Sequence, residues 1–282
     1  MSLRAAAGAA RRPVIIEPRR GPLAFNFGEL WEYRELLIYL AWREVRVRYK
    51  QSVLGIAWML LQPLAAMTIF SVVFGRFAHL PSEGMPYPLF VLAGLLPWQL
   101  FASSLTRSAG SLVGNANLLT KVYFPRLIIP LSAALAGLVD FTISLVLLVG
   151  ALIYFGVRPG WQIVTLPFFA LLALLAAISL GLWLSALNVR YRDVQVALPF
   201  IVQIWLFASP VTYSASLVPG GASRLIYELN PMASIIQGFR WSLAGGTPPG
   251  LQLLGSTALL LAILIGGLIY FRSAEKTFAD VV

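Results

Sequence analysis

The sequence predicts an all-α integral membrane protein, and three observations lead to this prediction. Of its 282 residues, 59% are hydrophobic and only 11% are charged, with a mean hydropathy of +0.81, a balance outside that of ordinary soluble domains. The apolar residues gather in stretches of roughly 20, the length with which a helix crosses about 30 Å of hydrocarbon. The cations behind the net charge of +10 stand between these stretches, whereas a nucleic-acid-binding protein spreads them over a polar surface. We therefore expect a membrane protein and no nucleic-acid partner.

The N-terminal region predicts a tail followed by an interface helix. Residues 1–25 combine arginines, alanines and prolines without an apolar core, which indicates a flexible cytoplasmic tail and no signal peptide. Residues 26–50 open with Asn26 and Glu29 in a capping-box pattern and continue with apolar residues at helical spacing. This predicts an amphipathic helix on the inner membrane surface, acting as an anchor or as a docking site for a cytoplasmic partner. Its end forms a basic collar expected at anionic inner-leaflet lipids: Arg43, Arg46, Arg48 and Lys50.

The apolar stretches predict six transmembrane helices within a membrane domain of residues 54–275. Prolines and glycines inside them predict kinks, because neighbouring helices can satisfy the backbone groups that a kink frees. Most of the 21 lysines and arginines lie before the first stretch or after the second, fourth and sixth, so both termini are expected in the cytoplasm. The expected spans are about 54–76, 88–112, 128–156, 162–187, 195–213 and 251–271.

Two connections between the spans carry further structure. The segment "GNANLLTKVYFPRL" (114–127) suits a short cytoplasmic helix that touches a partner, but a plain connecting loop would look the same. Residues 214–250 contain apolar positions at helical spacing on both sides of Asn230 and Pro231, yet neither half reaches spanning length. We expect two short re-entrant helices on the outer side, packed against protein.

The residue types that common catalytic sites require are missing. There is no cysteine, the single histidine is His79, and none of the three lysines follows a glycine as a phosphate-binding loop would need. Zinc sites built on histidine and nucleophiles activated by histidine therefore lack their parts. We expect no enzyme activity, no metal and no cofactor in this chain.

One acidic and one basic residue fall inside the predicted spans. Asp140 lies midway along the third span, where an acid is either functional or held by serine, threonine or backbone donors of a neighbouring helix. Arg107 is expected to extend its side chain toward the inner interface. A proton-coupled carrier would need a relay of such groups, and the spans offer no second acid.

Aromatic residues are frequent within the spans. Ring faces pack against the C–H faces of sugars without fixing one register, which would suit a sliding polymer. Rings near span ends more often form interfacial belts, and rings in mid-span more often serve packing. The residues considered as lining a channel are Trp58, Phe70, Trp98, Phe101, Trp183 and Trp205.

Five short strings appear in the order and spacing seen in one transporter family. They are "RYKQSVLGIAWMLLQP", "GLLPWQLFASSL", "LNVRYRDV", "SPVTYS" and "LNPM". With them the chain resembles, from about residue 29 to 275, the permease subunits of ABC exporters that move O-antigen, capsule or teichoic-acid polysaccharides. Each string is weak alone, but all five around six spans are specific.

The resemblance implies a homodimeric permease in the bacterial inner membrane that passes a lipid-linked polysaccharide outward. It implies two copies of a separate ATP-binding cassette subunit, which would hold the ATP and magnesium. It places the glycan channel between the permease copies, lined by the aromatic residues named above. By position, the family's coupling helix would comprise Asn117, Leu118, Leu119, Lys121, Tyr123, Phe124, Pro125 and Arg126. Its outer gate helices would include Tyr227, Asn230, Pro231 and Arg240.

Three other functions remain open from the sequence. An exporter of drugs or small lipids in the wider ABC class would share this topology and have a narrow channel with few aromatic residues. A secondary carrier would show internal repeats and paired intramembrane ionisable groups. A membrane scaffold would not need short apolar helices at the outer surface.

Overall fold

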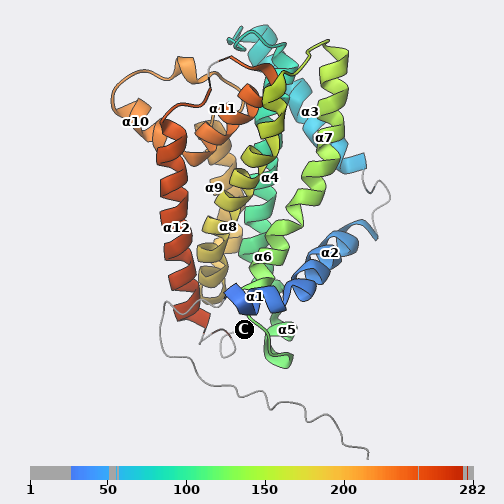
Figure 1. The fold of residues 1–282 in the computed structure, drawn as a ribbon, viewed down its shortest axis with the longest axis vertical. Coiled ribbons are helices and arrows are strands. Elements are labelled where there is room, and N and C mark those ends of the chain that lie inside the picture. The colour runs from blue at the N-terminus through green and yellow to red at the C-terminus, as the bar shows by residue number, and fades with distance from the viewer. Residues whose placement is uncertain (1–26, 51–54, 56, 247, 276–277, 279–282) are drawn as a thin grey trace, which may run out of the picture.

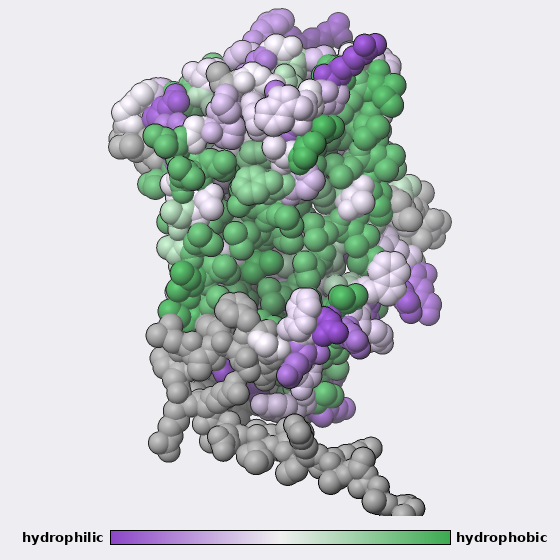
Figure 2. Space-filling model, in the orientation of Figure 1, coloured by the Kyte–Doolittle hydropathy of each residue, from purple (hydrophilic) through white to green (hydrophobic). Residues whose placement is uncertain are grey.

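The long helices of the computed structural model run side by side along its long axis, and shorter helices lie at its two ends (Figure 1). The structure describes residues 27–50, 55, 57–246, 248–275 and 278, and within these it contains helices and short loops but no strand. The predicted tail, residues 1–25, lies outside the described residues. Figure 2 shows a broad hydrophobic band between two ends that carry hydrophilic residues. The all-α membrane fold predicted from the sequence is confirmed.

Five helical segments are long and apolar enough to cross a membrane. The first joins α3 (Ala57–Phe70) to a π-helical continuation, η1 (Ser71–Phe77), and the third joins α6 (Ile128–Leu135) to α7 (Gly137–Tyr154) through a turn at Ala136. The others are α4 (Tyr87–Gly114), η2 with α8 (Trp161–Thr165 and Leu166–Arg190), and α12 (Gln252–Ala274). They lie where five of the six predicted spans were placed.

The remaining predicted span, 195–213, is shorter than expected. Helix α9 covers Asp193–Ala208, and its 16 residues extend over about 24 Å, less than the roughly 30 Å of a hydrocarbon core. It ends because Ser209 precedes Pro210 and takes an extended conformation, with ψ of 148°. The structure thus supports five spans and one shorter apolar helix, and a count of six is not confirmed.

The predicted interface helix is divided in two. Helices α1 (Phe27–Glu32) and α2 (Arg34–Lys50) are separated by a turn at Tyr33. Leu40 and Val45 on α2 are buried, and α2 packs against α6. In Figure 1 both helices lie at the end of the molecule that also holds the short helix α5 (Ala116–Lys121).

Helix α4 is the centre of the packing. Of its most apolar 18-residue stretch, 78% is buried, and its main neighbour is α8. Small residues let these helices approach closely: Gly181 on α8 faces Ser108, and the Asn188 amide donates to the Ala109 carbonyl at 3.0 Å. Helices α3 and α9 lie outside this core, with Pro63 and Leu198 as their only buried residues.

Two short helices precede the last span, as the sequence predicts. Helix α10 covers Ala222–Leu229 and α11 covers Pro231–Ala244, and Asn230 caps α11 by accepting a hydrogen bond from the Met232 amide. Most residues of α11 are buried. Their predicted role as an outer gate stays a prediction.

Candidate functional site

A cleft of about 730 Å³ lies between α3, α4, α7 and α9. Its walls are mostly apolar and aromatic, and one end is charged. Since α3 and α9 have few buried residues, the two helices form exposed sides of the cleft. Residues from each wall include Trp58 and Phe70 of α3, Trp98 of α4, Phe141 of α7 and Val202 of α9.

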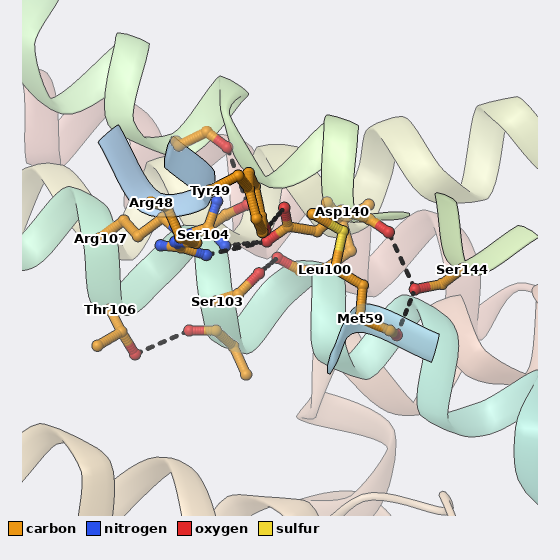
Figure 3. A network of polar contacts seen from close by, with 12 residues as sticks. Arg48, Tyr49, Met59, Leu100, Ser103, Ser104, Thr106, Arg107, Asp140 and Ser144 are labelled. Carbon is orange, nitrogen blue, oxygen red and sulfur yellow. Dashed lines mark hydrogen bonds and ion pairs between the residues drawn. The ribbon is translucent and has the colours of Figure 1, made fainter. Parts of the chain in front are cut away.

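The charged end of the cleft is built around Asp140 on α7. One carboxylate oxygen accepts a hydrogen bond from the Tyr49 hydroxyl at 2.8 Å, and the other accepts one from the Arg48 guanidinium at 3.1 Å. The second oxygen also forms an ion pair with Arg107 of α4. Figure 3 shows these side chains converging on Asp140 from three helices. The cluster links α2, α4 and α7.

The cluster contains more positive than negative charge. The side chains of Arg107 and Asp140 are 12% and 20% exposed, whereas Arg48 is 44% exposed. A buried carboxylate shared by two guanidiniums offsets the cost of removing one cation from water, and the second cation stays partly solvated. Partial burial, together with the Asp140 carboxylate, raises the pKa of Tyr49, so its hydroxyl remains a donor at neutral pH.

Two sequence predictions are corrected here, and one stays a prediction. Arg107 pairs with Asp140 beside Arg48 and Tyr49 of α2, so its extension toward the inner interface stays a prediction. The Asp140 carboxylate is held by arginines and a tyrosine instead of serine, threonine or backbone donors. Ser144 donates to the backbone carbonyl of Asp140 at 2.9 Å, not to its carboxylate. Two collar residues also point into the protein, because Arg48 pairs with Asp140 and Arg43 donates to Asn115.

The six aromatic candidates fall into three groups. Trp58, Phe70 and Trp98 line the cleft. Phe101 and Trp205 pack behind Trp98, with ring centroids 5.4 Å and 6.3 Å from it, and the Trp205 indole donates to Asn230 at 3.1 Å. Trp183 stacks on a tyrosine of α12 at 5.0 Å, and the structure does not bring it to the cleft.

Neutral polar residues on the cleft walls were missed in the sequence. Gln62 on α3 and Gln99, Ser103 and Thr106 on α4 all line it. Two glutamines inside apolar spans are a signal that could have found this surface, since polar side chains in membrane helices face protein or water. Arg48 and Tyr49 were also missed as partners of Asp140, because they lie more than 90 residues from it in sequence.

The segment after α5 presents some side chains and buries others. Tyr123 is 72% exposed and Val122 is 55% exposed. Phe124 is buried in a cluster with Leu119, and the Arg126 guanidinium donates to the Glu275 carbonyl. Of the other predicted coupling residues, Asn117 and Lys121 are exposed, whereas Leu118 and Pro125 are half-buried.

Arg240, which the sequence resemblance placed in the outer gate helices, is an internal residue of α11. It is 4% exposed and donates to the carbonyls of Val211 at 2.8 Å and Phe90 at 3.3 Å, with its guanidinium over the Phe90 ring. Burial lowers its pKa to about 10, so it is still charged at neutral pH. Burial likewise raises the pKa of Tyr227, which lies near Arg240. Among the described residues, no group of three His, Cys, Asp or Glu side chains could hold a metal.

Comparison with known proteins identifies relatives over nearly the whole chain. The family model described as ABC-2 type transporter matches residues 35–244. The chain is 32% identical over 255 residues to the O-antigen export system permease protein RfbA of Myxococcus xanthus, covering 89% of this chain and 97% of the relative. It is 29% identical over 266 residues to the protein of that name from Klebsiella pneumoniae, with 92% and 98% covered. It is 26% identical over 240 residues to the polysialic acid transport protein KpsM of Escherichia coli, with 83% and 91% covered.

Proposed function

The chain belongs to the ABC-2 type transporter family, and from this membership we propose that it is the permease subunit of an ATP-driven polysaccharide exporter. The relatives that support this, over 83% or more of the chain, are named for O-antigen export and polysialic acid transport. A drug or small-lipid exporter has no comparable support among them. The substrate we propose is a lipid-linked polysaccharide of the O-antigen or capsule type, moved across the bacterial inner membrane.

The observation that carries this proposal is the aromatic cleft between α3, α4, α7 and α9. Its exposed walls would be completed by a second copy of the chain, so that the path for the glycan lies between two permeases. The side chains that support such a contact are Trp58 at 53%, Phe200 at 67% and Ile204 at 54% exposure. Rings such as the exposed Trp58 and the half-buried Phe70 would then face sugar rings while the polymer slides.

The ATP-binding subunits would contact the permease at the end that carries α5. Lys121, Val122 and Tyr123 extend outward there, whereas Phe124 and Arg126 fix the segment to the rest of the protein. We place two copies of an ATP-binding subunit, with their ATP and magnesium, against this surface. This end would be cytoplasmic with both termini, and the exposed Trp31, Tyr39 and Trp42 of α1 and α2 would lie among lipid headgroups.

The proposed cycle follows from unequal binding to two states. Closure of the ATP-binding subunits would move the Lys121–Tyr123 surface and shift the two permeases against each other. Because a conformational change does work only when ligands bind its states unequally, the glycan must bind the inward state and leave the outward state. The cleft residues would supply that difference.

The test is reconstitution of the chain with its partner ATPase in vesicles, measuring glycan export and ATP hydrolysis. Tyr123→Ala should uncouple the two activities and reduce export strongly. Tyr154→Ala is the matched control, since Tyr154 is 83% exposed at the end of α7 away from α5. Export by this chain without ATP, or an equal loss in both variants, would contradict the proposal.

A further inference from the structure

The first membrane span contains a stretch of π-helix, a rare conformation that is found frequently at functional sites. Residues Ser71–Phe77 form η1, and a further wide turn follows, in which the Ala78 amide donates to the Val73 carbonyl at 3.0 Å. A π turn closes on the fifth residue instead of the fourth, so it holds one residue more than an α turn. Replacing the π turn by an α turn therefore shifts the register of the preceding helix by one residue.

The two parts of this span are held very differently. At η1, the Gly75 backbone lies so close to the Tyr87 ring of α4 that an added Cβ would be 2.7 Å from it. Helix α3 has no charged side chain, and Pro63 is its only buried residue. Because Pro63 has no N–H group for the Met59 carbonyl, this carbonyl accepts a hydrogen bond from Ser144 of α7, and at 3.5 Å the bond is long (Figure 3). Helix α3 can therefore turn while η1 stays in place.

A register shift would change the face that α3 presents to the cleft. One residue corresponds to about 100° of turn and about 1.5 Å of rise. When π turns become α turns and η1 stays against α4, the preceding chain winds further, so each position is taken by the next residue in sequence. Met67, which is half-buried and outside the cleft, then takes the place of Ala66. Gln62 and Phe70 leave the cleft, because the positions one residue before them do not line it.

We propose that α3 lines the cleft with two alternative faces, and that η1 exchanges them by changing between π and α turns. The first face carries the Gln62 amide and the Phe70 ring, which can hydrogen-bond a sugar hydroxyl and cover a sugar ring. The second face presents Met67, which offers neither. This exchange supplies the unequal glycan binding that the proposed cycle requires, so the inference rests on the proposed function. Closure of the ATP-binding subunits is the step that drives it.

Single cysteines test the exchange without background, since the sequence contains no cysteine. Ala66→Cys and Met67→Cys are each assembled with the ATP-binding partner in nanodiscs. The rate of reaction with a water-soluble thiol reagent is measured without nucleotide and with ATP plus orthovanadate. Upon adding ATP and orthovanadate we expect changes on the order of tenfold, a fall at Ala66→Cys and a rise at Met67→Cys, because reaction requires an accessible thiolate. Ala65→Cys is the matched control, because Ala65 and the position of Leu64 that it would take are both exposed and outside the cleft.

A one-residue deletion tests the role of η1, and its first measurement needs no ATP. Val73 is 42% exposed, and deleting it removes the extra residue, so η1 should become α-helical with Ala66 still in the cleft. In this background Ala66→Cys should still react faster than Met67→Cys, and ATP with orthovanadate should no longer exchange them. The matched deletion removes Leu61, which is 46% exposed and precedes both labelled positions, and it should leave the exchange intact.

Three results would overturn the inference. Parallel changes at Ala66→Cys and Met67→Cys would show that the cleft opens or closes as a whole. A Val73 deletion in which Ala65→Cys becomes the reactive variant would show that η1 holds no extra residue. An assembled complex that hydrolyses ATP and exports glycan without exchanging the two faces would remove the inference and leave the proposed function standing. Faces that exchange in a complex that exports no glycan would contradict the proposed function alone, and if the Val73 deletion does not fold, labelling of the undeleted chain still decides.

Discussion

Replacing Asp140 by alanine should destabilise the protein more than replacing Arg48, its partner on α2, by alanine. The change leaves Arg107, 12% exposed, without its carboxylate. Breaking a buried ion pair costs about 3 to 5 kcal/mol because the remaining charge is uncompensated, and the 20% exposure of Asp140 places this pair near about 3 kcal/mol. Arg48→Ala removes a guanidinium that is 44% exposed, and a pair of that kind contributes about 0 to 1 kcal/mol.

The assay is thermal unfolding of the purified chain in one detergent, followed by intrinsic tryptophan fluorescence. At about 2 to 4 °C per kcal/mol, Asp140→Ala should lower Tm by about 6 to 12 °C and Arg48→Ala by at most about 4 °C. The double variant Asp140→Ala/Arg107→Met should recover much of the loss, since it leaves no buried charge unpaired. Arg48 also loses Asp140, but its side chain is 44% exposed and can be solvated. Equal shifts for Asp140→Ala and Arg48→Ala, or a double variant less stable than Asp140→Ala, would refute the reasoning.

Three further predictions concern the α11 region. Gly238→Ala should cost about 1 to 3 kcal/mol, measured by Tm, because the new Cβ would overlap the Phe169 ring; an unchanged Tm would show that the ring can move aside. Trp205→Phe should remove the hydrogen bond to Asn230 and lower stability by about 1 kcal/mol. If α11 responds to the cleft, export should fall by more than the loss of folded protein accounts for. An export loss equal to the loss of folded protein would contradict that link. Arg240→Met should be tolerated better than Arg240→Ala in the same unfolding assay, because methionine fills the space of the buried stem; equal losses would assign the stability to the guanidinium hydrogen bonds.

The sequence predicted the features that depend on local chemistry. Hydropathy over about 20 residues placed the helices α4, α8 and α12, because the bilayer sets that length whatever the tertiary fold. The two short helices on either side of Asn230 followed from the proline that comes next, since proline fits the first turn of a helix and breaks the one before it. The end of α9 was missed, although Ser209 before Pro210 carried the signal.

The candidate site was harder to predict because its partners are distant in sequence. Asp140 and Arg107 stood out as charges inside apolar helices, but their pairing depends on the register of α4 against α7. Arg48 was assigned to lipid, since a basic residue beside a span ordinarily lies there, and only the packing of α2 against α6 turns it inward. The same limit applies to Tyr123 and Phe124: with no helical period after Lys121, nothing local tells which of the two is exposed.

Holding the fold together and lining the exposed side of the cleft are tasks of different helices, because α4 is central and α3 is peripheral. Residues of α4 with almost no exposure hold the fold, so exchanges there disturb close packing. Along α3, where Pro63 is the only buried residue, exchanges disturb the packing within one chain much less. Natural variation can therefore remodel the α3 side of the cleft and leave the scaffold intact, which gives one architecture room to diverge toward chemically different polymers.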